Sequence, residues 1–460
     1  MKRQIDDYLR AWKDSKTRRP LLIRGARQVG KTYAVDAFGA ADFTHYVKIN
    51  FEQEAAFREL FQEENIGEIC RSIELLKGVP LIEGQTLLFL DEIQACPEAI
   101  VRLRYFFEEK PGLHLVAAGS LLDFTLSTWK YSMPVGRVEF AYMYPMNFTE
   151  FLWGMGETAL TEYLEAFQVG RDVMSRPVHE KLLKWVRYYY FIGGMPEAVR
   201  VFAETGSLLE VEKIHERILT SYALDFAKYG SRKQQEIMQH LLEYIPAVTG
   251  RKFKFSSVNP EAGWRSAQIR EALELLGKSR LIHFVYASKA SGIPLSKDKN
   301  QRVFKLLFLD IGLLNHQLKL RLLDVEELIT NHEGALAEQF VGQQLIASGP
   351  WFMEKQLFYW LREKRKAEAE VDFLLDFTGE LLPVEVKAGS SGRLRSLHVF
   401  MAEKKLPKAL RYHADLPSAA RVDIRIPIGG GMQRVEYELY SLPLYMGLNA
   451  LPKTSPFNCI

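Results

Sequence analysis

Short apolar segments and amphipathic segments alternate along the first third of the chain. The mainly apolar segments lie at residues 20–25, 46–49, 87–90 and 115–118, and segments of this length predict buried strands. Between them, stretches such as 52–62 place apolar residues at helical spacing. Strands that alternate with helices predict a parallel sheet covered by helices, so we expect an α/β fold that begins with such a sheet.

The pattern becomes helical and rich in aromatic residues from about residue 148. This part includes the segment HEKLLKWVRYYYF, which precedes the turn GGMPEA, and it predicts a helical lid. A further helix is predicted from Ser266 to Gly277, because apolar residues recur there at the spacing i, i+3, i+4 and i+7. These apolar residues are Ile269, Ala272, Leu273 and Leu276.

Two strands are predicted directly after this helix. They are LIHFVY and VFKLLF, and the loop between them holds Lys289, Lys297, Lys299 and Arg302. A helix followed by a hairpin is typical of a winged helix. The weakly patterned stretch 316–332 predicts a linker into a last α/β domain. We therefore expect domains at residues 1–155, 156–245, 246–320 and 321–460.

Composition and charge narrow the class of protein. Apolar residues make up 47% of the 460 residues and charged residues 25%, which is typical of a globular chain. The 60 Lys and Arg nearly balance the 57 Asp and Glu, so any surface for nucleic acid must be local. Three scattered cysteines fit neither a disulfide framework nor a zinc site. With no apolar run near 18 residues long, we expect a soluble cytoplasmic protein without membrane contact.

The segment GARQVGKT follows the first predicted strand and precedes a predicted helix. It fits the pattern G-x-x-x-x-G-K-[ST] in the context that a phosphate-binding loop requires. Its glycines let backbone N–H groups close around phosphates, Lys31 brings a positive charge to them, and the Thr32 hydroxyl can bind Mg²⁺. The predicted ATP-binding residues are Gly25, Ala26, Arg27, Gln28, Val29, Gly30, Lys31 and Thr32.

A second motif, LLFLDEIQ, lies where a P-loop protein needs an acidic pair. Its apolar residues predict a strand that delivers Asp91 to the carboxyl end of the sheet, where this carboxylate can hold Mg²⁺. The adjacent Glu92 can polarise the attacking water. After the next strand, Ser120 in HLVAAGS can orient water or the γ-phosphate. Arg137 in PVGRVEF is a candidate phosphate-contacting residue, within the subunit or in a neighbouring one, and a surface arginine is the alternative.

These motifs together resemble a family of bacterial and archaeal AAA-type ATPases. The resemblance rests on GARQVGKT, LLFLDEIQ, AAGS, GRVEF, YPMNFTEF and GGMPEA, and it extends to LLFLDIGLL, GALAEQFV and AEVDFLLD with LPVEVKAG. Members join a P-loop domain to a winged helix and to a carboxy-terminal domain of unknown function that is similar to the PD-(D/E)XK nuclease fold. The resemblance implies ATP binding and gives no biological role.

The segment EVDFLLDFTGELLPVEVK predicts a hairpin with chemistry on one face. If Thr378 and Gly379 form the centre of an even-numbered turn, Asp372 faces Glu385, with Cβ atoms about 4.5 to 5.5 Å apart. Lys387 shares their face, because side chains alternate along a strand. The nuclease signature asks for an Asp, then an acid, any residue and Lys, which this arrangement supplies. A three-residue bulged turn would separate the two acids.

These residues make a second Mg²⁺ or Mn²⁺ site a hypothesis. Asp372 and Glu385 would hold the metal, and Lys387 would stabilise developing charge. A further ligand can come from Glu338 in GALAEQFVGQQL, which shares a helix face with apolar residues and so needs a cation or a donor. The alternative is a salt-bridge ladder in which Glu370 faces Lys387 on an exposed face.

Three functions remain open on the sequence. The first is an Mg²⁺-dependent ATPase whose nucleotide state controls a winged helix and a nuclease-like domain on DNA, with Arg265, Arg270 and the basic loop as DNA contacts. The second is an ATP-driven switch whose terminal domain binds DNA or a protein without cutting. The third, a small-molecule kinase, leaves two domains without a role. An arginine that acts in a neighbouring subunit would require a homo-oligomer.

Overall fold

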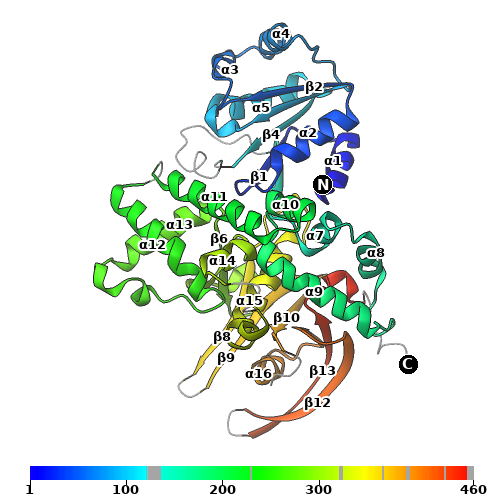
Figure 1. The fold of residues 1–460 in the computed structure, drawn as a ribbon, viewed down its shortest axis with the longest axis vertical. Helices are drawn as coiled ribbons and strands as arrows, with labels where there is room; N and C mark the ends of the chain where they lie inside the picture. Colours follow the sequence, from blue (N-terminus) through cyan, green and yellow to red (C-terminus); the bar gives the residue numbers. More distant parts are fainter. Residues whose placement is uncertain are drawn as a thin grey trace. The chain divides into compact units, whose positions relative to one another are not determined.

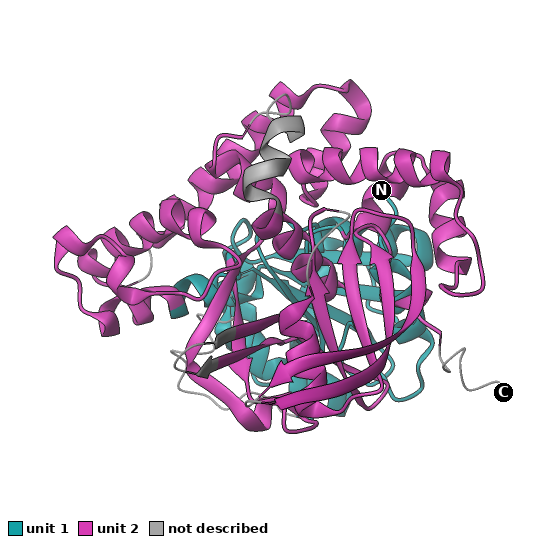
Figure 2. Ribbon diagram, turned by 90° about the horizontal axis from the view of Figure 1, so that it is seen from below, with its two compact units in different colours: residues 1–146, 274–281, 349–354 teal, residues 147–273, 282–348, 355–460 magenta. Residues whose placement is uncertain are grey.

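The structure is a computed structural model that describes residues 1–120, 122, 136–227, 230–320, 325–364, 367–389, 394–428 and 431–452. Side chains at 325–333 and 363–368 lie outside the description, as does Cys459. The chain forms two compact units, which Figure 2 distinguishes by colour. Unit 1 comprises residues 1–146, 274–281 and 349–354, and unit 2 comprises residues 147–273, 282–348 and 355–460. In the described part of the chain, no helix is long and apolar enough to cross a bilayer.

Unit 1 contains a five-stranded parallel sheet in the order β2-β3-β4-β1-β5. Its strands are β1 (Leu21–Gly25), β2 (His45–Asn50), β3 (Thr86–Asp91), β4 (His114–Gly119) and β5 (Glu139–Met143). The helices are α1 (Ile5–Asp14), α2 (Lys31–Asp42), α3 (Ala56–Leu60), α4 (Ile66–Lys77) and α5 (Pro97–Glu109) (Figure 1). The predicted parallel sheet is therefore confirmed.

The core of unit 1 shows why these segments form strands. Every residue of β3 and β4 is buried, which matches the continuous apolar runs that a parallel sheet with both faces covered requires. Helices α4 and α5 pack on this sheet through residues such as Ile69, Ile73 and Leu103. Because all the strands are parallel, their carboxyl ends lie at one edge of the sheet, and that edge carries the candidate nucleotide site.

Unit 2 begins with helices, as the pattern from residue 148 predicts. They are α7 (Phe148–Gly154), α8 (Thr158–Ala166), α9 (Arg176–Ile192), α10 (Pro196–Thr205), α11 (Leu208–Phe226) and α12 (Arg232–Val248). Helices α14 (Ile311–Gln317), α15 (Val325–Ala347) and α16 (Arg395–Lys404) follow later in the chain. The predicted linker at 316–332 differs from the structure, because residues from Val325 onward belong to α15.

An eight-stranded mixed sheet forms the rest of unit 2, in the order β12-β13-β11-β10-β9-β8-β6-β7. Its strands are β6 (Ile282–Ser288), β7 (Lys299–Phe308), β8 (Leu357–Lys364), β9 (Ala367–Phe377), β10 (Glu380–Val386), β11 (Lys408–His413), β12 (Ser418–Ile428) and β13 (Gly431–Pro443). Helix α13 (Ser266–Lys278) and the hairpin β6–β7 follow one another as predicted. However, β6 also pairs with β8, so the hairpin continues the carboxy-terminal sheet across the expected boundary at residue 320.

A buried carboxylate explains two motifs that looked functional in the sequence. Asp310, in LLFLDIGLL, is fully buried and accepts hydrogen bonds from the backbone N–H groups of Gly194 at 2.6 Å and Gly312 at 2.9 Å. The side-chain amide of Gln343 donates to the same carboxylate at 2.8 Å. The turn GGMPEA, which holds Gly194, is therefore fixed to the start of α14 by Asp310.

Candidate nucleotide-binding site and acidic cluster

The phosphate-binding loop connects β1 to α2 in unit 1. Gly25 ends β1, and a Cβ atom there would lie 2.3 Å from the backbone oxygen of Met143, so this position requires glycine. Gly30 has φ 93° and precedes the first residue of α2, a left-handed conformation that glycine adopts without strain. The free N–H groups at the start of α2 face the loop, as in anion sites at helix N-termini.

Lys31 lies inside this loop. Its Nζ donates hydrogen bonds to the backbone oxygens of Gly25 at 3.0 Å and Ala26 at 2.7 Å, and the side chain is buried. Burial lowers the pKa of Lys31 to about 8, although the nearby carboxylates of Glu92 and Asp91 act in the opposite direction. The ammonium group is therefore desolvated and held where an anionic ligand of the loop would stabilise it.

Thr32 and Asp91 come together as the sequence predicts. The Thr32 hydroxyl lies 3.2 Å from both carboxylate oxygens of Asp91, which is buried at the end of β3. Burial, and then the charge of Glu92, raises the pKa of Asp91. Lys48 Nζ lies 3.6 Å from Asp91 Oδ2. A hydroxyl beside a carboxylate at the end of the P-loop is a donor set of hard oxygens, which fits Mg²⁺.

Glu92 follows Asp91 in a left-handed conformation with φ 50°. Its backbone N–H donates to Oδ1 of Asp91 at 3.1 Å, and its Oε2 accepts a hydrogen bond from Nε2 of Gln94 at 2.6 Å. Gln94 is a residue to which the sequence analysis assigned no role. The signal was its place in LLFLDEIQ, two residues after Glu92, where a tight turn brings the two side chains together.

Ser120 and Arg137 have different positions in the sheet. Ser120 is buried directly after β4, so it lies at the edge that carries Asp91. Arg137 comes just before β5, whose first residue pairs with the first residue of β1, and so it lies near the opposite edge. There its Nε contacts Glu108 Oε1 at 3.0 Å. The structure does not bring Arg137 to the P-loop of its own chain, and action on a neighbouring subunit stays a prediction.

Arg280 is a second residue without a role in the sequence analysis. It belongs to unit 1, is buried, and contacts Glu354 at 2.9 Å. Its guanidinium lies 5.4 Å from the ring centre of Tyr142, and Arg24 lies over the same ring at 5.4 Å. The positive charge of Arg280 contributes to lowering the pKa of Lys31, which shows that this arginine adds to the positive potential of the site.

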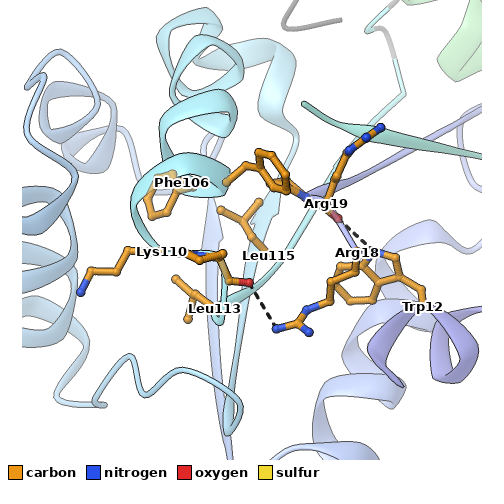
Figure 3. Close-up of a pocket in the computed structure, with 10 residues that line it drawn as sticks. Trp12, Arg18, Arg19, Phe106, Lys110, Leu113 and Leu115 are labelled. Atoms are coloured by element: carbon orange, nitrogen blue, oxygen red, sulfur yellow. Dashed lines mark hydrogen bonds between the residues drawn. The ribbon is translucent and has the colours of Figure 1, made fainter. Parts of the chain in front are cut away.

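A small cavity in unit 1 is distinct from this site. It lies between the end of α1, the end of α5 and the starts of β1 and β4, and its lining includes Trp12, Arg18 and Leu115 (Figure 3). Trp12 Nε1 donates to the backbone oxygen of Arg19 at 2.9 Å along its wall. With a volume of about 10 Å³, the cavity holds no more than a water molecule. It therefore has no part in nucleotide binding.

The hairpin β9–β10 in unit 2 has the predicted register. Phe377 pairs with Glu380 and Phe373 with Val384, and Asp372 and Glu385 lie directly beyond this last pair. Thr378 and Gly379 both have positive φ, 55° and 82°, as a two-residue turn of type I′ requires. Asp372 also accepts a hydrogen bond from the backbone N–H of Val386 at 2.7 Å.

Lys305 on β7 lies among the acidic side chains that the sequence analysis singled out. Its Nζ contacts Glu338 Oε1 at 2.8 Å and Asp372 Oδ1 at 3.8 Å, and it also forms an ion pair with Glu370. Glu338 is buried on α15, so the predicted need of this carboxylate for a cation is met by Lys305. The signal for Lys305 was one basic residue inside the apolar strand VFKLLF.

Lys387 contacts its neighbour on the same strand. Its Nζ lies 2.6 Å from Oε1 of Glu385, and the expected ladder between Glu370 and Lys387 is replaced by the pair of Glu370 with Lys305. Glu385 is buried, and its Oε2 has no hydrogen-bond partner among the described residues. Burial, and then the charge of Asp372, raises the pKa of Glu385 to about 8.

Comparisons with known proteins agree with the geometry of unit 1. The family model of an AAA domain matches residues 17–152. Models of two domains of unknown function match residues 183–324 and 333–424. Among curated proteins, none matches the chain.

Solved structures that are similar to this chain include one of an ATPase, one of a complex with DNA and one of a branch migration motor. A Walker-type ATPase of Pyrococcus abyssi is 14% identical, with 68% of this chain and 95% of that one covered and a TM-score of 0.43. The ORC1 protein of Aeropyrum pernix, solved in complex with DNA, is 13% identical over 69% and 90%, with a TM-score of 0.30. The RuvB Holliday junction branch migration motor of Thermotoga maritima is 15% identical over 60% and 84%, with a TM-score of 0.28. Similarity at this level carries no conclusion about function.

The family model and the geometry of the P-loop together identify residues 17–152 as an AAA-type P-loop ATPase domain.

Proposed function

We propose that unit 1 binds ATP together with Mg²⁺ and hydrolyses the terminal phosphate in the cytoplasm. The observation that carries this proposal is the approach of Thr32 to Asp91, 3.2 Å at each carboxylate oxygen, next to the buried ammonium of Lys31. A bound Mg²⁺ would neutralise charge on the β- and γ-phosphates, and Thr32 and Asp91 are the residues that would hold it.

The chain's own residues divide the remaining work. Lys31 supplies positive charge to the phosphates, and the backbone N–H groups of the loop donate hydrogen bonds to the phosphate oxygens. Glu92 polarises the attacking water, since its carboxylate lies beside the metal-binding pair and is held by Gln94. Ser120 lies at the same edge and is the candidate for orienting water or the γ-phosphate.

Phosphate release by purified protein tests this proposal. Wild type should hydrolyse ATP only when Mg²⁺ is present, Lys31→Ala should lose nucleotide binding or turnover, and Glu92→Gln should bind ATP and hydrolyse it poorly. Lys16→Ala is a matched control, because Lys16 is exposed in the turn before β1. Normal turnover by Lys31→Ala or Glu92→Gln would refute the assignment.

In this proposal, the nucleotide state of unit 1 controls the binding of DNA by unit 2. The loop between β6 and β7 presents two exposed basic residues, Lys289 and Lys297, and the start of β7 presents a third, Arg302; these residues support contact with DNA phosphates. Two other predicted DNA contacts already have structural partners: Arg270 donates to the backbone oxygen of Gln301 at 2.8 Å, and Lys299 lies 3.8 Å from the ring centre of Tyr286. Binding of labelled duplex DNA, with and without ATP, to wild type and to a variant with the three exposed residues changed to Ala tests this role.

Strand cleavage by unit 2 is the second candidate, and it is supported by the register of the hairpin, because continuing that register by one residue would place Asp372 opposite Glu385. In this proposal unit 2 is a PD-(D/E)XK-like domain that cuts DNA with Mg²⁺ or Mn²⁺. Plasmid, short duplex and branched DNA should then be cut by wild type and left intact by Asp372→Ala and Lys387→Ala. Intact DNA in the wild-type reaction would favour a switch whose unit 2 binds without cutting.

A further inference from the structure

Lys305 is a buried lysine that forms ion pairs with several carboxylates. Its side chain has no exposed surface, and its neighbours on β7, Phe304 and Leu306, are buried apolar residues. An unpaired ammonium at such a position would cost several kcal/mol in desolvation. The fold meets this cost with carboxylates from two elements, Glu338 on α15 and the pair Glu370 and Asp372 on β9.

The position of the ammonium bears directly on metal binding. Two of the carboxylates that contact Lys305, Glu338 and Asp372, are residues that the sequence assigned to a divalent cation. Lys305 Nζ lies within ion-pair distance of one oxygen of each of Glu338, Glu370 and Asp372. An ammonium group carries three N–H donors and no acceptor, so it takes the position from which a metal ion would reach these oxygens.

We propose that Lys305 is the resident cation of this cluster, so that its ammonium replaces a divalent metal and unit 2 binds its partner without cutting strands. Among the described residues, no group of three or more His, Cys, Asp or Glu side chains is arranged to hold a metal ion. Among the fully buried side-chain oxygens of the cluster, Glu385 Oε2 is the one without a hydrogen-bond partner in the described part of the chain. One such oxygen is far fewer than the six or so ligands that Mg²⁺ takes.

Removal of the ammonium should open the site. In Lys305→Met an uncharged side chain of similar length replaces the lysine. The four carboxylates, Glu338, Glu370, Asp372 and Glu385, then lose their ion pairs with Lys305 and keep that of Glu385 with Lys387. A cluster with this excess of negative charge in a buried position should attract a divalent cation. The inference does not depend on ATP hydrolysis, because all of these residues belong to unit 2.

Binding of Mn²⁺ to the nucleotide-free full chain, followed by electron paramagnetic resonance, tests the wild type first. Wild type and Asp372→Asn should bind equal amounts of Mn²⁺, because the cluster contributes none. Asp372→Asn keeps an oxygen acceptor for the N–H of Val386 and changes only the charge. If wild type binds Mn²⁺ that Asp372→Asn and Glu385→Gln both lose, the cluster is a metal site and the proposal is overturned.

A second measurement tests whether removal of the Lys305 ammonium creates a site for Mn²⁺. Lys305→Met should bind one more Mn²⁺ per chain than wild type, and adding Asp372→Asn to it should abolish that gain. If Lys305→Met does not fold, Lys305→Gln serves in its place, because its uncharged amide can still donate a hydrogen bond to Glu338. A folded variant of either kind that binds no more Mn²⁺ than wild type would contradict the proposal. ATP hydrolysis by Lys305→Met, measured in parallel, separates this result from any failure of the proposed function of unit 1.

Discussion

Gln94 donates a hydrogen bond from Nε2 to Oε2 of Glu92 at 2.6 Å. Because Glu92 has a left-handed backbone conformation at the end of β3, its side chain needs a partner to keep one orientation. Gln94 supplies this partner from the short helix that follows, η1 (Ile93–Ala95). We therefore regard Gln94 as a residue that positions the proposed catalytic carboxylate.

The first prediction concerns this pair. Gln94→Ala should lower kcat for ATP hydrolysis about tenfold, since a hydrogen bond to a charged group contributes roughly 1.5 kcal/mol. The KM for ATP should stay the same, because the hydrogen bond that the substitution removes is made to Glu92 and not to a phosphate. Steady-state kinetics beside Glu92→Gln measures both constants. A raised KM at unchanged kcat would assign Gln94 to binding instead.

The second prediction is a pH dependence of ATP binding. Burial lowers the pKa of Lys31 to about 8, so in the nucleotide-free protein the ammonium form predominates below pH 8 and the neutral amine above it. Bound phosphates favour the ammonium, and binding above pH 8 therefore requires uptake of a proton. The Kd for ATP should be constant below this pH and rise about tenfold for each pH unit above it.

Titration of a fluorescent ATP analogue between pH 6.5 and 9.5 measures this dependence. Lys31→Arg is the matched control, because an arginine stays charged throughout this range. Its affinity should be weaker than that of wild type and free of the break near pH 8. A wild-type affinity that does not change up to pH 9.5 would show that Lys31 does not lose its proton in the free protein.

Local sequence patterns were sufficient to predict the P-loop and the acidic pair of unit 1. Thr32 and Asp91 lie 59 positions apart, yet their contact could be predicted, because each follows the end of a strand and parallel strands align their carboxyl ends. The register of β9 and β10 could be predicted for a similar reason, since a two-residue turn fixes which residues face each other.

Contacts that depend on strand order could not be predicted in this way. Lys305 on β7 contacts Glu370 and Asp372 on β9 because β6 joins the two hairpins by pairing with β8, a strand about seventy positions later in the chain. No local sequence pattern predicts that pairing. Arg280 is a similar case, because it adds its charge to a P-loop some 250 positions earlier in the chain. Such pairings follow from the tertiary fold, and here they determine that the acidic cluster contains the ammonium of Lys305.

The third prediction concerns the turn between β9 and β10. Thr378 has φ 55°, a conformation that is strained for a β-branched residue and that asparagine tolerates. Thr378→Asn should therefore stabilise the protein by about 0.5 to 1 kcal/mol. Chemical denaturation of wild type and Thr378→Asn measures the difference in the free energy of unfolding. A loss of stability would mean that a contact of the Thr378 side chain stabilises the protein by more free energy than the backbone strain costs.

The last prediction tests Asp310, the carboxylate that fixes the turn GGMPEA. Gly193 has φ 69°, and a Cβ atom added there would lie 1.9 Å from Asp310 Oδ1 and 2.9 Å from the backbone nitrogen of Gly312. Gly206 ends α10 at nearly the same φ, 65°, and an added Cβ would meet no atom within 4 Å. The two backbones differ in ψ, which is −165° at Gly193 and 7° at Gly206, so an alanine at Gly193 meets a larger backbone strain as well as the clash with Asp310.

Gly206→Ala should lower the free energy of unfolding by about 1 kcal/mol, the cost of a left-handed alanine. Gly193→Ala should cost at least 2 kcal/mol more, because Asp310 must move and at least one N–H group then loses its buried acceptor. Asp310→Ala should give a loss of similar size through the same unpaired donors. Urea unfolding of the three variants measures these differences. Equal losses for the two glycine variants would show that the carboxylate can move freely, and that the turn is not held by Asp310.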